Sequence, residues 1–266
     1  KAVICLIGER RGEAITKAER VDTVVRTRPA VEWCFETPLA RFALEHTRIE
    51  SFLKQIAKGK QIMHLLEPVQ ADLAGRLSGT FFLIMDVDAT LAPVAQHHQI
   101  QNAICDWILA ESDKLDAAED KGPIGDCDLI GRPSGVPFDV ILHKDASYGS
   151  DLFIIQHLPV ELCTLRRERI RKALDRKCPK LLDEKRKGKI SVLILESDDI
   201  ALANRTEIAE ATVAELSKRV DAPDIVLWAR TSTYPWKTWF IKDGSYMYPY
   251  IMNSGPFILD PARGCL

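Results

Sequence analysis

The sequence lacks several features that would place the protein in a membrane, in an oxidising compartment or in a common hydrolase family. No apolar run among its 266 residues approaches the roughly 20 that a helix needs to span a bilayer, so no membrane association is predicted. Its seven cysteines are scattered, odd in number and without a CxxC pair. This pattern argues against a zinc site and against a disulfide framework, and it favours a reducing, cytoplasmic location. GxSxG and P-loop glycine patterns are also missing from the sequence.

The chain has almost no net charge, with 36 Lys and Arg against 38 Asp and Glu. A net charge of −2 gives no overall attraction to nucleic acid or to a membrane surface, so any basic surface must be local. The hydrophobic content of 46% is enough to bury a substantial core, in one large domain or in two modest ones. Composition therefore indicates a globular protein whose partners must be inferred from local motifs.

Apolar runs and their periodicity predict the fold class. Continuous apolar stretches at 79–89 and 189–197 have the length of buried strands. The apolar residues between 97 and 116 recur at helical spacing. Strands and amphipathic helices in this mixture predict an α/β fold with a mixed central sheet and flanking helices.

The best loop candidate is a stretch rich in Gly and Pro at 121–135, which is either a domain boundary or a functional loop. We therefore expect an N-terminal part at 1–120, which contains the hairpin described below and the long helix. The C-terminal part, 121–266, is expected to continue the same sheet or to form a second subdomain. The C-terminal part is expected to be of the α/β class.

Proline is expected to interrupt two predicted helices, one at 51–77 near Pro68 and one at 159–187 at Pro179. The charged segment 1–28 is also predicted to be helical.

Further along the chain, the segments 136–144 and 151–159 are predicted to form a strand pair. A helix is expected to begin with Asn204 or Thr206 as its cap. The dipeptide Asp243-Gly244 is expected to form the turn of a terminal hairpin.

The stretch from 30 to 50 indicates a strand pair with chemistry on one face, because apolar and polar residues alternate on both sides of a short "TPLA" turn. Side chains two residues apart share a face of a strand, so Glu45 and Thr47 project together while His46 points the other way, toward the interior. Phosphodiester hydrolysis needs a divalent cation held by hard oxygen ligands. A carboxylate beside Pro29 would complete such a site, and the residue there is Ala30.

These residues resemble the motif of the PD-(D/E)XK, or restriction-endonuclease-like, nuclease superfamily over about the first 60 residues. The resemblance implies that Glu45 is the acidic residue of the (D/E)XK half-motif and a metal ligand, and that Thr47 stands where the motif usually has lysine. Ala30 then occupies the aspartate position of the Pro-Asp motif, as a ligand position that is vacant or was mutated. Glu13 or Glu19 would be the acidic residue usual on the first helix.

Two substitutions could compensate for these departures from the motif. Glu32 lies two residues beyond Ala30 and could reach the same face as a metal ligand. Arg48 or Lys54 could take the place of the missing lysine. The resemblance implies a restriction-endonuclease-like core and a hydrolase that uses Mg²⁺ or Mn²⁺ to cleave nucleic acid, or a degenerate relative that binds nucleic acid without cleaving it.

A basic segment supports a polyanionic partner. Residues 166–189 contain twelve Lys and Arg against four acidic residues. Four of the cations recur at helical spacing and so share one helix face: Arg166, Arg169, Lys172 and Arg176. Such a face can contact phosphates without reading sequence. The alternative is an ordinary solvated helix face whose charges pair with neighbouring acids.

A second motif points to a different enzyme. Asp86 and Asp88 end an apolar strand in a D-x-D-x-T pattern that resembles the first motif of the haloacid-dehalogenase-like phosphatases. That resemblance implies Asp86 as the nucleophile and Asp88 as the general acid. The partners implied for this site are the acidic pair Asp198 and Asp199 and a lysine, Lys177 or Lys180. A third hypothesis is a non-catalytic module that binds nucleic acid.

Overall fold

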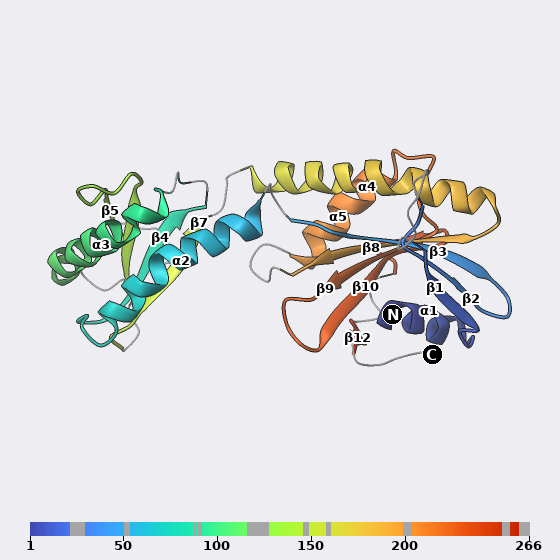
Figure 1. The fold of residues 1–266 in the computed structure, drawn as a ribbon, viewed down its shortest axis with the longest axis horizontal. Helices are drawn as coiled ribbons and strands as arrows, with labels where there is room; N and C mark the ends of the chain where they lie inside the picture. Colours follow the sequence, from blue (N-terminus) through green and yellow to red (C-terminus); the bar gives the residue numbers. More distant parts are fainter. Residues whose placement is uncertain are drawn as a thin grey trace. The chain divides into compact units, whose positions relative to one another are not determined.

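The computed structural model describes residues 1–21, 30–50, 54–87, 89, 92–115, 128–145, 149–157, 161–198, 204–251 and 256–260. The chain forms two compact units (Figure 1). Unit 1 consists of Lys1–Leu53 and Leu162–Leu266, and unit 2 consists of Lys54–Glu161. Unit 2 is therefore inserted between two segments of unit 1.

Unit 1 is built on a mixed sheet with the strand order β1-β2-β3-β8-β9-β10-β11, and β12 also pairs with β10. Strands β1, β2 and β3 form an antiparallel meander, whereas β3, β8 and β9 run parallel. The elements of unit 1 are α1 (Ala2–Arg11), β1 (Lys17–Arg20), β2 (Trp33–Glu36), β3 (Arg41–Arg48), α4 (Leu162–Arg186), β8 (Ile190–Ser197), α5 (Arg205–Leu216), β9 (Ile225–Arg230), β10 (Trp236–Asp243), β11 (Tyr246–Met247) and β12 (Phe257–Leu259).

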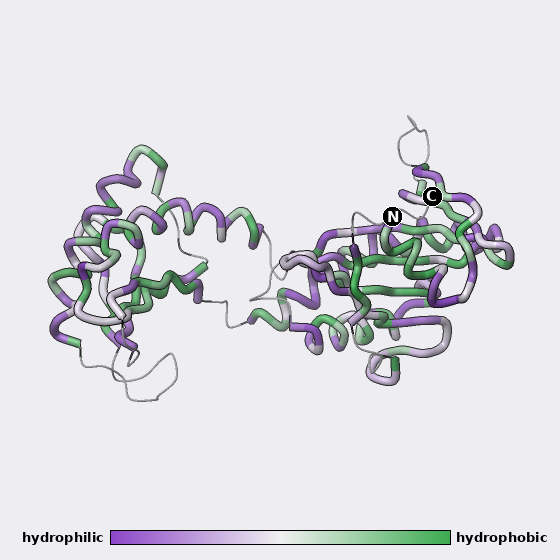
Figure 2. The backbone as a smooth tube through the Cα atoms, turned by 90° about the horizontal axis from the view of Figure 1, so that it is seen from below, coloured by the Kyte–Doolittle hydropathy of each residue, from purple (hydrophilic) through white to green (hydrophobic). Residues whose placement is uncertain are grey.

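Helices cover both faces of this sheet, with α4 and α5 on one face and α1 on the other (Figure 1). The parallel strands β8 and β9 are nearly continuous apolar runs, as expected for strands that are covered on both faces. Figure 2 shows the hydrophobic residues of unit 1 gathered along these strands. The core of unit 1 therefore lies in two layers, one on each side of the sheet.

Unit 2 is a smaller α/β body with a four-stranded sheet in the order β5-β6-β4-β7. Strand β4 is parallel to β7 and antiparallel to β6. Gly131 of β5 lies where a side chain would meet the Trp107 ring of α3 at 2.5 Å, so the close approach of helix and strand requires glycine there. The elements of unit 2 are α2 (Gln55–Leu73), β4 (Thr80–Asp86), α3 (His97–Glu111), β5 (Asp128–Gly131), β6 (Val140–Asp145) and β7 (Leu152–His157).

The α/β class and the mixed, helix-flanked sheet predicted from the sequence are confirmed. The division of the chain differs from the expected one at 120/121, because a long insertion forms its own sheet and so places boundaries near 53 and 161. No helix in the described part of the chain is both long and apolar enough to cross a membrane.

Neither proline interrupts its helix. Helix α2 continues through Pro68 and α4 continues through Pro179. Each helix buries apolar side chains on both sides of its proline, for example Leu174 and Leu181 in α4. Packing of this stripe against the rest of the unit outweighs the hydrogen bond that the proline cannot donate.

Two further predictions of secondary structure and strand pairing were wrong. The segment 1–28 is not one helix: α1 ends at Arg11, Gly12 has a positive φ of 67°, and β1 follows. Strands β6 and β7 do not pair with each other, because β4 lies between them and pairs with both.

Two signals with a direct physical cause are confirmed. The Asn204 side chain accepts a hydrogen bond from the backbone N–H of Thr206 at 2.9 Å, which caps α5. Gly244 has a positive φ of 63° in the turn between β10 and β11, as the Asp243-Gly244 dipeptide predicts.

The scattered cysteines were not expected to form disulfides, but one of them does. Cys5 is disulfide-bonded. The other described cysteines are free thiols, so the partner of Cys5 lies outside the described residues.

Candidate functional site

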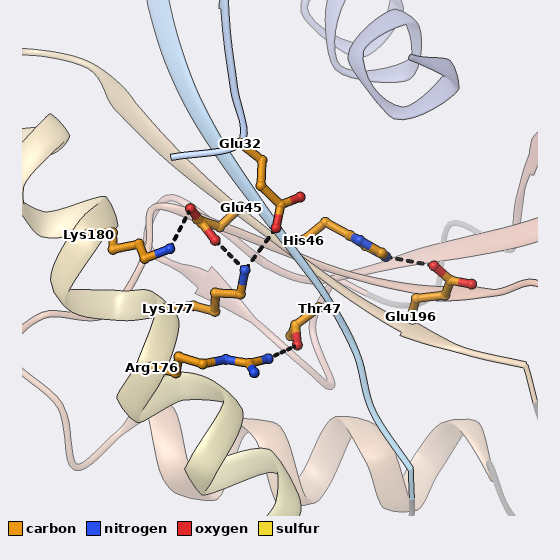
Figure 3. Close-up of polar contacts among 8 residues, drawn as sticks. All are labelled: Glu32, Glu45, His46, Thr47, Arg176, Lys177, Lys180 and Glu196. Carbon is orange, nitrogen blue, oxygen red and sulfur yellow. Dashed lines mark hydrogen bonds and ion pairs between the residues drawn. The ribbon is translucent and has the colours of Figure 1, made fainter. Parts of the chain in front are cut away.

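Strand β3 has two chemically different sides. Glu45 and Thr47 face α4, and His46 points away from them, as the alternation of a strand predicts (Figure 3). The side covered by the helix is the one that carries Glu45, which is 0% exposed. His46 was expected to face the interior, but its side chain is 38% exposed. Alternation determined which residues share a face, but it did not determine how deeply each side chain is buried.

A carboxylate–lysine cluster, formed by Glu32, Glu45, Lys177 and Lys180, lies between the hairpin and α4 (Figure 3). Trp33 pairs with Leu44 across the hairpin, so Glu32, one residue earlier, stands opposite Glu45. The register of β2 and β3 therefore brings two carboxylates together.

The ammonium group of Lys177 joins these two carboxylates. Its Nζ donates a hydrogen bond to Glu32 Oε1 at 2.8 Å and another to Glu45 Oε2. The Nζ of Lys180 lies 3.5 Å from Glu45 Oε1. That second contact is an ion pair without a hydrogen bond, so Glu45 Oε1 is a buried oxygen that accepts no hydrogen bond.

The cluster keeps Lys177 charged although its side chain is only 9% exposed. Burial favours the neutral amine, but the hydrogen bonds to Glu32 and Glu45 favour the ammonium form more strongly. The pKa of Lys177 is therefore raised above its usual value. A buried charge of this kind is tolerated only when it is paired and hydrogen-bonded.

Beside the cluster lies a basic pocket of about 220 Å³ at the end of β3. It is lined by Thr47, Arg48, Ile49, Arg169, Lys172, Ala173 and Arg176. The Nη2 of Arg176 donates a hydrogen bond to the Thr47 hydroxyl at 2.8 Å, which links helix and strand (Figure 3). The pocket thus adjoins the cluster along the same face of β3.

Carboxylates compensate the pocket only in part. Lys172 Nζ lies 2.7 Å from Glu168 Oε1, and Arg48 pairs with Asp198. Arg169 Nη2 lies 3.7 Å from a carboxylate oxygen of Glu50, which is a loose contact. Within the described part of the chain, the buried Nε of Arg169 has no hydrogen-bond partner.

Arg176 differs from the other three cations of the pocket. Among the interactions of the described residues, its side chain contacts the uncharged Thr47 hydroxyl and no carboxylate. The pocket therefore carries positive charge that the described residues do not neutralise.

The opposite side of β3 carries a separate polar group. His46 Nε2 lies 2.6 Å from Glu196 Oε2, and the Thr231 hydroxyl donates to Glu196 Oε1 at 2.8 Å. The hydrogen bond with His46 is the main reason that the pKa of Glu196 is lowered. Since His46 points away from Glu45, this group is distinct from the cluster (Figure 3).

The structure does not bring the predicted acidic residues of the N-terminal segment to Glu45. Glu13 follows α1, which lies on the sheet face opposite α4 (Figure 1). Glu19 is in β1, two strands away from β3, and pairs with Lys17 at 3.2 Å. The reason is that 17–20 form a strand rather than part of the first helix.

Ala30 does not occupy the metal-ligand position that the motif implies. Ala30 precedes β2, and its methyl group offers no ligand atom. The carboxylate that stands opposite Glu45 is that of Glu32, as the two-residue offset suggested.

Three of the four predicted phosphate contacts line the basic pocket, namely Arg169, Lys172 and Arg176. Arg166 does not: its side chain is 3% exposed and it pairs with Glu207 of α5. Burial lowers the pKa of Arg166. Helical spacing placed it on the correct face, but that part of the face is covered by α5.

The groups needed by a haloacid-dehalogenase-like phosphatase are distributed over both units. Asp86 belongs to unit 2, is 70% exposed and lies 2.8 Å from His157 Nδ1. Asp198 belongs to unit 1 and pairs with Arg48. The expected roles of Asp88 and Asp199 fall outside the described residues. Both lysines considered for that mechanism contact Glu45 instead.

Sequence patterns did not assign Lys177 or Lys180 to a site around Glu45, and they considered Arg48 only as a replacement for the missing lysine of the motif. Their only signal was the density of cations in 166–189 and the position of Arg48 next to Thr47. Within the described residues, no group of three or more His, Cys, Asp or Glu side chains could hold a metal ion. No family model, curated protein or solved structure matches the chain.

Proposed function

We propose that the protein is a metal-dependent nuclease that binds nucleic acid along the face of β3 covered by α4. One observation supports this most directly. A single strand face carries the buried Glu45, joined by Lys177 to Glu32, and two residues further on it opens into a basic pocket. Carboxylates beside a cationic surface are what hydrolysis of a phosphodiester requires.

The order of elements supports the same proposal. A helix, three antiparallel strands, a second helix and a strand parallel to the third follow each other as α1, β1–β3, α4 and β8 in unit 1. This arrangement is compatible with the restriction-endonuclease-like core that the hairpin motif implies. Lys177, which comes from α4, would take the place of the motif's lysine.

The charge distribution supports a nucleic-acid partner for unit 1. Residues 54–161 contain 8 Lys and Arg against 16 Asp and Glu, which leaves 28 cations against 22 acids in unit 1. The near-zero net charge of the chain thus combines a basic unit and an acidic unit. Attraction of a polyanion is expected from unit 1.

The two carboxylates of the cluster are of the ligand type that magnesium and manganese ions prefer. Such ions are commonly held by one or two carboxylates, with water and substrate phosphate completing the shell. Glu45 Oε1, which is buried and accepts no hydrogen bond, and the carboxylate of Glu32 would hold it. When bound, the ion supplies Lewis-acid polarisation of the phosphoryl group and an activated water.

The remaining groups of the site have roles that follow from their contacts. Lys177 holds the two carboxylates in place and supplies positive charge beside them. Arg169, Lys172 and Arg176 would contact phosphates of the substrate.

A non-catalytic nucleic-acid-binding protein is the second candidate, and one observation favours it. Lys177 already compensates both carboxylates, and the described residues supply no third ligand for a metal. In that case the cluster would serve to join α4 to the hairpin, and only the basic pocket would contact nucleic acid.

Cleavage of labelled single- and double-stranded DNA and RNA in Mg²⁺ and Mn²⁺ tests the proposal. Glu45→Gln and Glu32→Gln are expected to abolish cleavage, whereas Glu19→Gln, which alters an exposed carboxylate in β1, is the matched control and should cleave like the wild type. Salt-dependent binding without cleavage by the wild-type chain would favour the second candidate.

The same assay resolves the position of the first ligand. If Ala30→Asp creates or strongly increases cleavage, the first metal ligand belongs at position 30. If it does not, and Glu32→Gln abolishes cleavage, Glu32 holds that role.

A further inference from the structure

We infer that the basic pocket is a binding site for one phosphate group, held by Arg176 and Arg169, with the Thr47 hydroxyl positioning Arg176. The inference deepens the proposed function and rests on it only in naming nucleic acid as the source of that phosphate. The binding of a phosphate group itself requires no cleavage at Glu45.

The size of the pocket limits its ligand to a small group. Its volume is about 220 Å³. Sites for drug-sized ligands have about 300–1,000 Å³. A tetrahedral oxyanion is therefore a better match than a whole nucleotide, whose sugar and base would remain outside.

The donors in the pocket suit an oxyanion. A guanidinium group carries five N–H donors in a planar fork that matches phosphate oxygens. Arg176 uses one side of its fork on Thr47 Oγ1 and contacts no carboxylate among the described residues. The buried Nε of Arg169 has no hydrogen-bond partner among the described residues, so this donor is available to a ligand.

Thr47 acquires a definite role in this site. It stands where the nuclease motif has lysine, yet its hydroxyl accepts a hydrogen bond from Arg176 Nη2 at 2.8 Å. Thr47 thereby fixes the orientation of the guanidinium at the wall of the pocket. It is a positioning residue for the anion site rather than a substitute for a catalytic cation.

The phosphate could come from two sources that share this chemistry. One is a terminal phosphate monoester of a nucleic-acid strand, and the other is an internal phosphodiester. The pocket lies beside the cluster on one strand face, so either would hold a strand in register with Glu45.

Titration calorimetry with inorganic phosphate tests the site directly on the full chain. The wild type is expected to bind, and Arg176→Gln or Arg169→Gln should weaken binding about tenfold or more, because each removes a charge-assisted hydrogen bond. Arg171→Gln is the matched control, since Arg171 is on the same helix, is exposed and does not line the pocket. Thermal unfolding of each variant shows whether it is folded.

Three results separate this inference from the proposed function. Equal phosphate affinity for the wild type, Arg176→Gln and Arg169→Gln would overturn the inference, even if Glu45-dependent cleavage were found. Phosphate binding retained in Glu45→Gln would support it, even if no variant cleaved nucleic acid. Tighter binding of 5′- or 3′-phosphorylated oligonucleotides than of their hydroxyl counterparts, lost in Arg176→Gln, would identify the terminal monoester as the source. Equal binding of both, weakened by Arg176→Gln, would identify internal phosphodiesters.

Discussion

Helix α4 contacts β3 at two neighbouring places that balance their charges differently. In the carboxylate–lysine cluster, Lys177 and Lys180 both lie against Glu45, and Glu32 takes a second hydrogen bond from Lys177. Arg176, which precedes Lys177 in α4, belongs to the basic pocket. Among the described residues its side chain hydrogen-bonds only to the Thr47 hydroxyl. The cations of one helix are therefore divided between internal pairing and a surface that can accept an external anion.

This difference has an energetic consequence. The cluster is a buried ion-pair network in which the loss of one member leaves a buried charge without its main partner. The pocket is a set of partly exposed cations whose removal leaves little uncompensated charge behind. The cluster should therefore dominate stability, and the pocket should dominate the affinity for polyanions.

The largest expected effect is that of Lys177→Met. Among the described residues, Glu45 would keep the longer contact to Lys180 alone, so we expect a loss of about 3–5 kcal/mol in the free energy of unfolding. Urea unfolding measures this loss. The exposed Lys187→Met is the matched control and should change stability by at most about 1 kcal/mol.

The double variant Glu45→Leu with Lys177→Met sharpens the result. Because it removes both buried charges together, it should recover most of the lost stability. A double variant as unstable as the sum of both single variants would show that Glu45 and Lys177 are not energetically coupled, which would contradict this explanation of the loss.

An intermediate effect is expected from pH. The pKa of Lys177 is raised in the folded protein above the value of 10.5, so its contribution to stability is complete below pH 10.5 and is lost as the pH rises through the folded pKa. The difference in unfolding free energy between the wild type and Lys177→Met should therefore shrink above pH 10.5. A difference that stays constant from neutral to strongly alkaline pH would contradict this assignment.

The smallest expected effect on stability is that of Arg176→Gln. It removes one hydrogen bond to Thr47 and no described carboxylate contact, so a loss of about 0.5–1.5 kcal/mol is expected in urea unfolding. The same variant should lower the salt dependence of nucleic-acid binding by about one phosphate contact. If Arg176→Gln lowered the unfolding free energy as much as Lys177→Met does, the cluster would not contribute more to stability than the pocket.

Local patterns predicted the hairpin correctly. Alternation placed Glu45 and Thr47 on one face, and the offset of two residues brought Glu32 opposite Glu45. These features depend on neighbouring residues and on the fixed period of a strand, which the sequence displays directly.

Local sequence patterns could not predict contacts between residues that are distant in the chain. Lys177 reaches Glu45 from 132 positions away, and all of unit 2 lies between them in the chain. Burial of Arg166 beneath α5 and the strand at 17–20 likewise depend on what the tertiary fold places nearby. Amphipathic spacing defined the cationic face of α4, but only the packing of α5 determined which part of that face is open.

The insertion of unit 2 between β3 and α4 also constrains how the chain is made. His46 of β3 and Glu196 of β8, which are hydrogen-bonded neighbours, are 150 positions apart. During synthesis, β3 emerges long before β8 can cover its edge, while the continuous segment Lys54–Glu161 is complete and able to fold on its own contacts. Pairing of such distant strands is slow because a large loop must close first. A nascent chain that stops before Ile190 therefore leaves β3 as an apolar edge strand, open to pairing with another chain.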